Sequence, residues 1–274
     1  MIGRAVMDLG LRDTVALIVG GASGIGWASA QAFAAEGAKV VIADLNGETA
    51  ADRAASLPQA WSRRVDVTSE DDIQALFAAV IEREGRLDSV VSCAGIGHLG
   101  AIRDIELADW QNVIDICLTG SFLVMKHAAR VMTGGGSIVN IASLNARQTA
   151  AGYGVYSAAK RGLTALAEVA ALELAADGVR VNTISPGLID TPLTNTLRAI
   201  PGVQEEFTDN TPLRRNGRPE DIAATALFLC SSMADWTTGD TLDVNGGGHL
   251  QRYPNVMAAA AALTPEEFEK LQSL

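Results

Sequence analysis

A tyrosine and a lysine four positions apart, Tyr156 and Lys160 in the stretch GVYSAAKRG, could carry out acid–base chemistry. At this spacing both side chains project from one face of a helix. A cation beside a phenol lowers the pKa of the phenol, which a tyrosine acting as a base near neutral pH requires. Ser143, at the end of the preceding predicted strand, could add a hydroxyl group to the same spot. Such a pair alone is more often a solvated helix face, so its meaning depends on the surrounding elements.

A glycine-rich turn lies near the N-terminus, where a β-branched stretch meets a helical one. In IVGGASGIGWA, Gly20, Gly24 and Gly26 are spaced so that the chain can turn tightly and approach a pyrophosphate at a helix N-terminus. A turn without any ligand shows the same pattern, so the glycines alone are weak evidence. Asp44 strengthens it, because it lies near the offset of about 20 residues expected for a carboxylate that binds the adenosine ribose. With no Arg or Lys at 21–23 or 45–46, the sequence favours NAD over NADP.

Strand-like and helix-like segments alternate along the chain and would position these residues. Stretches that predict strands occur at 14–20, 39–44, 62–68, 87–95, 136–143, 179–187 and 241–247. Their alternation with helical patterns predicts a doubly wound parallel sheet of the α/β class, with helices on both faces and a ligand outside the carboxyl ends of the strands. Residues 188–217 contain at most short helices and are expected to form a substrate lid.

Composition and charge narrow the range of partners. The chain has 274 residues, and its net charge of −11 argues against nucleic acid or an anionic membrane as the main partner. Its three cysteines and three histidines are too widely spaced for a disulfide framework or a metal site. No signal peptide or membrane span is apparent, which favours the cytoplasm.

Together these motifs resemble the short-chain dehydrogenase/reductase (SDR) family, in its compact single-domain branch. The resemblance covers residues 10–250 and rests on GGASGIG, Asp44, VDV at 65–67, SCAG at 92–95, Ser143, YSAAK, SPGLIDTP at 185–192 and TLDVNGG at 241–247. It implies a seven-stranded Rossmann-fold domain over 1–250, a C-terminal helical extension over 251–274, and hydride transfer between NAD(H) and a secondary alcohol or ketone. Family members are commonly tetramers, so we expect the extension, with its Thr264/Glu267 capping box, to pack on a neighbouring subunit.

The resemblance also assigns roles to matching positions. Tyr156 would be the general acid and base, Ser143 would bind the substrate oxygen, and Lys160 would hold the nicotinamide ribose and lower the pKa of Tyr156. Besides Tyr156 and Lys160, the implied cofactor-binding residues are Gly20, Ser23, Gly24, Ile25, Gly26, Asp44, Leu45, Asp66, Val67, Cys93, Ala94, Gly95, Pro186, Gly187, Ile189 and Thr191. The expected substrate residues are Leu144, Asn145, Gln148, Tyr153, Leu188, Leu193 and Leu197. This mainly apolar set favours a neutral cyclic or aliphatic substrate, unless Arg147 or Arg198 turns inward.

The chain departs from the family pattern at three positions. Val19 stands where the family has Thr, and Cys93 stands where it has Asn. We interpret these two as a matched apolar pair, so Val19→Thr alone should bury an unpartnered hydroxyl at a cost of about 1–3 kcal/mol. Cys117, in DICL, replaces the Asn often counted as a fourth catalytic member; only its backbone carbonyl would keep a role, and the side chain that shapes the helix bend would be lost. We therefore expect an active enzyme with slower proton exchange.

Two alternatives remain open. A 3-oxoacyl-thioester (acyl carrier protein) reductase usually prefers NADPH, and Asp44 speaks against it. A non-catalytic NAD-binding sensor would explain the missing Asn but not the intact Ser143, Tyr156 and Lys160. His98 follows the fourth predicted strand at the catalytic edge and could contact the substrate, although a surface loop is the favoured interpretation.

Overall fold

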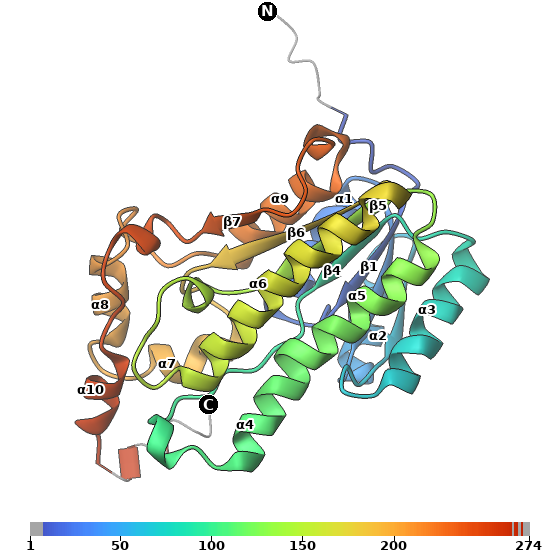
Figure 1. The fold of residues 1–274 in the computed structure, drawn as a ribbon. Helices are drawn as coiled ribbons and strands as arrows, with labels where there is room; N and C mark the ends of the chain where they lie inside the picture. The colour runs from blue at the N-terminus through green and yellow to red at the C-terminus, as the bar shows by residue number, and fades with distance from the viewer. Residues whose placement is uncertain (1–7, 265, 268–269, 271–274) are drawn as a thin grey trace, which may run out of the picture.

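Seven parallel strands form a single sheet in the order β3-β2-β1-β4-β5-β6-β7. This computed structural model describes residues 8–264, 266–267 and 270, and it confirms the predicted doubly wound parallel sheet (Figure 1). The strands are β1 (Val15–Val19), β2 (Lys39–Asp44), β3 (Ala60–Arg64), β4 (Ser89–Ser92), β5 (Gly136–Ile141), β6 (Val179–Pro186) and β7 (Thr241–Val244).

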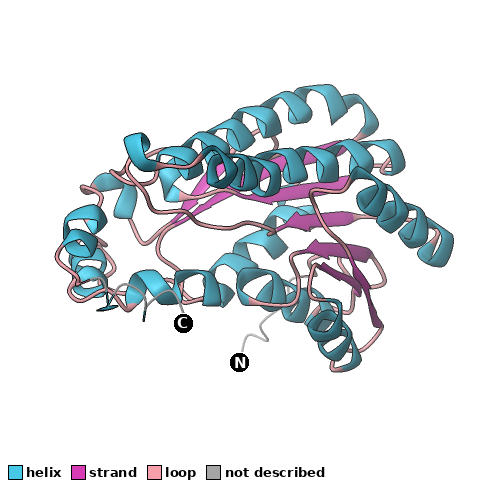
Figure 2. Cartoon of the chain, turned by 90° about the horizontal axis from the view of Figure 1, so that it is seen from below, coloured by secondary structure: helices cyan, strands magenta, loops and turns pink. Residues whose placement is uncertain are grey.

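Helices cover both faces of this sheet, as Figure 2 shows. One face packs against α3 (Glu70–Glu84), α5 (Gly120–Val131) and α6 (Gly154–Leu174). The other packs against α1 (Gly24–Ala35), α2 (Gly47–Ala55) and α9 (Pro219–Cys230). The remaining α-helices are α4 (Leu107–Ile114), α7 (Asn195–Arg198), α8 (Val203–Asp209) and α10 (Val256–Ala261).

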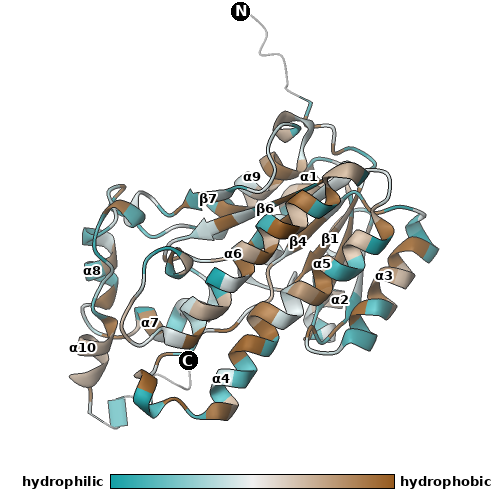
Figure 3. Cartoon of the chain, in the orientation of Figure 1, coloured by the Kyte–Doolittle hydropathy of each residue, from teal (hydrophilic) through white to brown (hydrophobic). Residues whose placement is uncertain are grey.

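The period-two alternation of strand side chains builds these two hydrophobic cores. In β1, Val15, Leu17 and Val19 enter the core under α3, α5 and α6, whereas Ala16 and Ile18 enter the core under α1 and α9. All five are buried, as expected of a central parallel strand covered on both sides. In Figure 3 the apolar colour accordingly concentrates on the central strands.

The strand order reverses beside β1, and this reversal positions the site. The chain runs outward from β1 through β2 to β3 and then returns to place β4 on the other side of β1. The loops that leave β1 and β4 therefore diverge and open a crevice at the carboxyl edge of the sheet.

The first helix begins at Gly24, so the glycine turn runs directly into it. The third strand ends at Arg64 rather than at 68, because the Asp66 carboxylate accepts hydrogen bonds from Thr68 N at 2.9 Å and Thr68 Oγ1 at 2.7 Å and turns the chain.

The C-terminal segment, residues 251–264, packs on the same chain. Val256 is buried against Ile200, Val203 and Phe207, and α8 and α10 lie at the same end of the molecule in Figure 1. Val256 of this segment therefore packs on residues 188–217 of its own chain, and its packing on a neighbouring subunit stays a prediction. The capping box is confirmed, since Glu267 Oε2 accepts hydrogen bonds from Thr264 N and Oγ1 at 2.8 and 2.9 Å. No helix among the described residues is long and apolar enough to span a membrane.

Candidate active site

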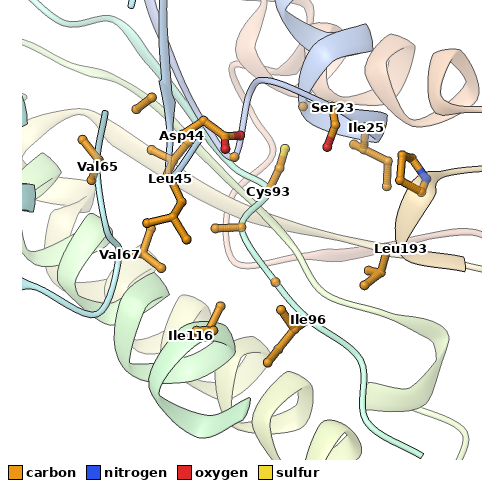
Figure 4. A pocket seen from close by; sticks show the side chains of 18 of the residues that line it. Ser23, Ile25, Asp44, Leu45, Val65, Val67, Cys93, Ile96, Ile116 and Leu193 are labelled. Atoms are coloured by element: carbon orange, nitrogen blue, oxygen red, sulfur yellow. The ribbon is translucent and has the colours of Figure 1, made fainter. Parts of the chain in front are cut away.

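A cavity of about 300 Å³ occupies the crevice between the loops after β1 and β4. Figure 4 shows Leu45, Val65 and Val67 on one side of it and Ile25 and Leu193 on the other. Of the sequence-predicted cofactor residues, those that line it are Gly20, Ser23, Gly24, Ile25, Gly26, Asp44, Leu45, Asp66, Val67, Cys93, Ala94, Gly95 and Thr191. Sequence reasoning missed its apolar members Val65, Ile96, Ile116 and Pro192.

The glycines of the turn leave room that a side chain would fill. A Cβ atom on Gly20, whose φ is +75°, would lie 2.7 Å from Ala94 N. A Cβ on Gly26 would lie 2.0 Å from Gly20 O, and one on Gly24 would lie 3.1 Å from Thr191 Cγ2. Only glycine allows the close backbone approaches at positions 20 and 26. The absence of side chains at these glycines leaves the N-terminus of α1 open to the cavity. The cavity therefore fits a dinucleotide whose phosphates lie at the N-terminus of α1.

Asp44 ends β2 at the edge of the same cavity. One carboxylate oxygen accepts a hydrogen bond from Ala22 N at 3.0 Å, and the other accepts one from Asn46 N at 2.9 Å. Arg64 is the β3 partner of Asp44, but its side chain lies outside the cavity lining, and its guanidinium is 3.9 Å from the Asp72 carboxylate. Among the described residues that line the cavity there is no Lys or Arg.

Three predicted cofactor residues lie elsewhere. Pro186 and Gly187 line a second cavity, which lies beside Ser143 and Tyr156 and is described below. Ile189 lines neither cavity, because its side chain is only 4% exposed and packs in the core with α1 and α9. The expected place of Ile189 beside the nicotinamide stays a prediction.

Ser143, Tyr156 and Lys160 meet beyond the carboxyl end of β5. Ser143 caps a short 3₁₀ turn, and its Oγ accepts a hydrogen bond from Asn145 N at 3.1 Å. Tyr156 lies in the first turn of α6 and lines the same cavity as Ser143. Lys160, one turn later and 3% exposed, donates to Ile141 O at 2.8 Å, and its Nζ lies 5.8 Å from the centre of the Tyr156 ring. The described residues contain no group of His, Cys, Asp and Glu that could hold a metal ion.

The phenol of Tyr156 is harder to ionise than the sequence suggests. Burial raises its pKa above the ordinary value, the nearby Cys117 thiol raises it further, and the hydrogen bond from Ser143 lowers it. The prediction that Lys160 brings this pKa down is therefore outweighed here by desolvation, because the ammonium group is turned to the Ile141 carbonyl.

This raised pKa gives the rate of alcohol oxidation a definite pH dependence. Phenolate is the form of Tyr156 that accepts a proton, and below the pKa its fraction rises tenfold for each pH unit. We expect kcat/KM for alcohol oxidation to increase with pH between 7 and 9, by up to about tenfold per unit. Ketone reduction, which uses the protonated phenol, should not increase over this range. Initial rates in a constant-ionic-strength buffer series measure both, and a flat oxidation profile would show that Tyr156 is not the titrating base.

Cys117 is fully buried in a single π-helical turn, Asp115–Thr119, between α4 and α5. Its Sγ lies 3.3 Å from both the N and the O atom of Ile96, so the thiol accepts from one and donates to the other. The bend is therefore present without the asparagine side chain, and the thiol contacts the loop after β4. The Cys117 carbonyl accepts a hydrogen bond from Ser121 Oγ at 3.1 Å.

The proposed pairing of Val19 with Cys93 is wrong. Val19 is in register with Ser92, and their side chains point to the face of α5 and α6. Cys93, the next residue, packs against the opposite core, and it contacts Val19 through a backbone hydrogen bond from Cys93 N to Val19 O at 2.8 Å.

This geometry reverses the stability prediction for position 19. Ser92 Oγ is buried and has no hydrogen-bond partner among the described residues, so a threonine at 19 would face an unpaired hydroxyl. We expect Val19→Thr to leave the free energy of unfolding unchanged or to raise it by up to about 1 kcal/mol. In a Ser92→Ala background the same substitution should cost about 1–3 kcal/mol, because the new hydroxyl is then unpaired. Denaturant melts of the four proteins test the pair, and equal destabilisation in both backgrounds would contradict it.

A second cavity, of about 410 Å³, lies beside Ser143 and Tyr156 and shares Leu193 with the first. The predicted substrate residues that line it are Leu144, Asn145, Tyr153, Leu188, Leu193 and Leu197. Gln148 does not line it, because its amide turns away and donates to Gln251 O in the C-terminal segment. His98 lies in a loop and lines this cavity, which agrees with the alternative that it contacts the substrate.

The sequence reasoning missed the part of the wall that comes from residues 200–253. Ile200, Phe207 and Tyr253 line this cavity. Arg147 and Arg198 do not enter it, since they pair with Asp243 and Asp190 respectively. Among the described lining residues there is no Lys or Arg, which agrees with an uncharged substrate.

Comparisons with known proteins agree with this arrangement. A family model described as enoyl-(acyl carrier protein) reductase matches residues 20–249. The cis-4-hydroxycyclohexanecarboxylate dehydrogenase of Sinomonas cyclohexanicum is 41% identical over 242 residues, 86% of this chain and 96% of that protein. The 2,5-dichloro-2,5-cyclohexadiene-1,4-diol dehydrogenase LinX of Sphingobium indicum is also 41% identical, over 86% of this chain and 96% of its own length. A solved short-chain type dehydrogenase/reductase from Mycobacterium ulcerans superposes with a TM-score of 0.89 at 35% identity, covering 94% of this chain and 98% of that one.

The fold and the comparisons define an oxidoreductase of the α/β class that uses a nicotinamide dinucleotide, NAD(P). The chain belongs to the short-chain dehydrogenase/reductase family.

Proposed function

We propose that this protein interconverts a neutral cyclic secondary alcohol and its ketone with NAD(H). One observation supports the proposal. Ser143, Tyr156 and the buried Lys160 lie close together where the first cavity, at the glycine turn (the glycine-turn cavity), adjoins the second cavity. The chemistry requires a proton donor and acceptor, a hydroxyl that holds the substrate oxygen and a fixed cation at this junction.

Each residue of the site has a separate role in this reaction. A bound nicotinamide supplies the hydride acceptor in oxidation and the hydride donor in reduction. Ser143 holds the substrate oxygen, and Tyr156 takes the hydroxyl proton in oxidation and returns it in reduction. Lys160 places a positive charge beside the phenol. Cys117 is assigned only a backbone role, in which its carbonyl assists proton exchange between Lys160 and solvent.

NAD rather than NADP is proposed because of Asp44. Its carboxylate closes the end of the glycine-turn cavity, where it can accept hydrogen bonds from ribose hydroxyls and repel a 2′-phosphate. The nearest cation on the neighbouring strand, Arg64, lies outside the lining near Asp72.

The substrate class follows from the shape and polarity of the second cavity. Its volume and its leucine and tyrosine walls suit a ring of about six atoms, and the names of both 41%-identical relatives specify ring alcohols. We assign 188–217 as the lid over this ring, and the C-terminal segment as a part of the same wall.

A homo-oligomer, of which a tetramer is the family expectation, is also part of the proposal. Large exposed apolar side chains lie along α4, α5 and α6, namely Leu107, Trp110, Phe122, Val169 and Leu172. An apolar face of this kind suits a second copy of the chain, and light scattering measures the oligomeric state. The three cysteines are free thiols, which suits a reducing cytoplasm.

A turnover assay tests the proposed function. The purified protein is mixed with NAD⁺ or NADP⁺ and a panel of cyclic and linear secondary alcohols, and absorbance of the reduced nucleotide is followed. We expect turnover of cyclic alcohols with NAD⁺. Turnover only of a 3-oxoacyl thioester with NADPH would favour the thioester reductase. Binding of NAD⁺ without turnover of any compound would favour a sensor.

A further inference from the structure

Two polar side chains in the wall of the second cavity, His98 and Tyr153, are left without a partner by the fold. Both line the cavity. Among the described residues, neither the imidazole of His98 nor the hydroxyl group of Tyr153 forms a hydrogen bond, and neither belongs to the unpartnered polar atoms that the fold closes off. Both groups therefore stay within reach of a molecule in the cavity.

Other polar groups of the same wall already have a task. Tyr253 OH donates a hydrogen bond to Asn145 Oδ1 at 3.1 Å. Ser143 and Tyr156 are assigned to the reacting oxygen of the substrate. A second oxygen on the same molecule would therefore find its free partners at the imidazole and at the remaining phenol.

The backbone brings His98 and Tyr153 together from two neighbouring segments. Gly100, in the loop after β4, forms an isolated parallel bridge with Tyr153, and its N atom donates a hydrogen bond to Gly152 O at 2.9 Å. A Cβ atom on Gly100 would lie 3.0 Å from His98 Nε2, so the imidazole lies against this glycine. The loop after β4 and the segment before α6 thus form one polar part of the cavity wall.

This polar part of the wall is next to the reacting centre. The rings of Tyr153 and Tyr156 pack edge-on, with their centres 6.4 Å apart. A molecule whose oxygen meets Tyr156 therefore lies beside Tyr153 as well.

Both groups can donate a hydrogen bond. Burial raises the pKa of Tyr153, and the neighbouring phenols of Tyr253 and Tyr156 raise it further, so the Tyr153 hydroxyl keeps its proton at neutral pH. An imidazole has at least one N–H donor in either protonation form. Since no Lys or Arg lines the cavity among the described residues, an uncharged acceptor suits these donors better than an anion does.

We propose that His98 and Tyr153 bind a second hydroxyl group of the substrate, so that the site prefers ring diols to ring alcohols with an apolar substituent at the same position. This inference rests on the proposed function for the place of the reacting oxygen at Ser143 and Tyr156. His98 and Tyr153 bind the substrate and take no part in the proton transfer.

A binding measurement that compares a hydroxyl with a methyl group tests this subsite. The cis and trans forms of 1,2-, 1,3- and 1,4-cyclohexanediol are each compared with the methylcyclohexanol of the same substitution. Dissociation constants are measured by calorimetry on the complex with NADH, with which an alcohol cannot react. In an apolar subsite the methyl compound binds more tightly, because a hydroxyl group there loses its hydrogen bonds to water.

For the wild type we expect the best diol to bind about tenfold more tightly than its methyl counterpart, as two hydrogen bonds allow. Tyr153→Phe and His98→Phe each remove one polar partner and keep a ring, and each should lower this ratio by about threefold or more. Thr196→Val is the matched control, because it removes a hydroxyl group from another part of the same cavity wall, on α7, and should keep the ratio. Melting temperatures and NADH binding verify that each variant is folded.

Three results would overturn the proposal: no diol is preferred by the wild type, either phenylalanine variant keeps the wild-type ratio, or Thr196→Val lowers it equally. Tighter binding of a hydroxycyclohexanecarboxylate than of every diol would also overturn it, since the pair would then take an anion. Turnover of the same alcohols with NAD⁺ separates this inference from the proposed function. Diol preference without any turnover would refute the enzymatic function and leave the subsite standing, and turnover without diol preference would do the reverse.

Discussion

Tyr156→Phe is expected to lower kcat for alcohol oxidation and ketone reduction by about 10²–10⁴-fold, the usual contribution of a positioned general acid and base. The substitution removes only the phenolic oxygen atom and keeps the ring, which packs against neighbouring apolar residues. Nucleotide binding should be retained, because the Tyr156 side chain lines the substrate cavity and not the glycine-turn cavity. Steady-state rates and NADH fluorescence measure the two effects separately.

Tyr153→Phe provides the comparison. Tyr153 lies three residues earlier, lines the same cavity and packs edge-on against Tyr156 with ring centres 6.4 Å apart. Loss of its hydroxyl should reduce kcat less than tenfold, since no proton transfer is assigned to it. If a folded Tyr156→Phe protein, checked by its melting temperature, kept more than a tenth of the wild-type kcat, the assignment of Tyr156 as the proton donor and acceptor would be refuted.

Asp44→Ala is expected to lower kcat/KM for NAD⁺ by about 10–100-fold, because hydrogen bonds to a charged group are each worth about 1.5–3 kcal/mol. The same change removes the repulsion of a 2′-phosphate, so kcat/KM for NADP⁺ should rise and the preference between the two nucleotides should narrow. Asp44→Asn separates the contribution of the negative charge from that of the hydrogen bonds. It removes the charge but retains an oxygen that can accept the Ala22 or Asn46 N–H, and it should lose less activity with NAD⁺ while still gaining with NADP⁺.

Asp71→Asn is a suitable control, since this carboxylate is exposed on α3 and lies outside the cavity lining. It changes the net charge by the same amount as Asp44→Asn and should leave the nucleotide preference unchanged. An unchanged preference in Asp44→Ala would show that the ribose end of the dinucleotide lies elsewhere.

Local patterns in the sequence are sufficient to predict the parallel sheet and most residues that line the cavity at the glycine turn. Alternation in β1 and the glycine spacing at 20–26 depend on neighbours in sequence, so they could be interpreted without coordinates. The four-residue spacing of Tyr156 and Lys160 is local in the same sense. Residues at the start of α1 and at the end of β2 followed directly from these elements.

The incorrect predictions concern features that contacts between distant segments determine. Val19 and Cys93 were paired by analogy between positions, but the register sets Val19 opposite Ser92, and register was not established from the sequence. The pKa of Tyr156 was assigned from its partner Lys160, whereas burial by distant segments dominates it. Tyr253 was overlooked because it lies beyond the last strand. A lone aromatic residue there gives no periodic signal, and only the docking of the segment on α8 brings it to Asn145.

The place of Tyr253 in the chain affects how such an enzyme can diversify. The seven strands and the glycine turn constrain the residues that form them, because changes there disturb the sheet or the nucleotide cavity. The described part of the C-terminal segment, residues 251–264, pairs with no strand, so we expect substitutions in it to leave the sheet and the glycine turn intact. Substrate preference can thus evolve at the end of the chain, one substitution at a time, while the reaction itself stays the same.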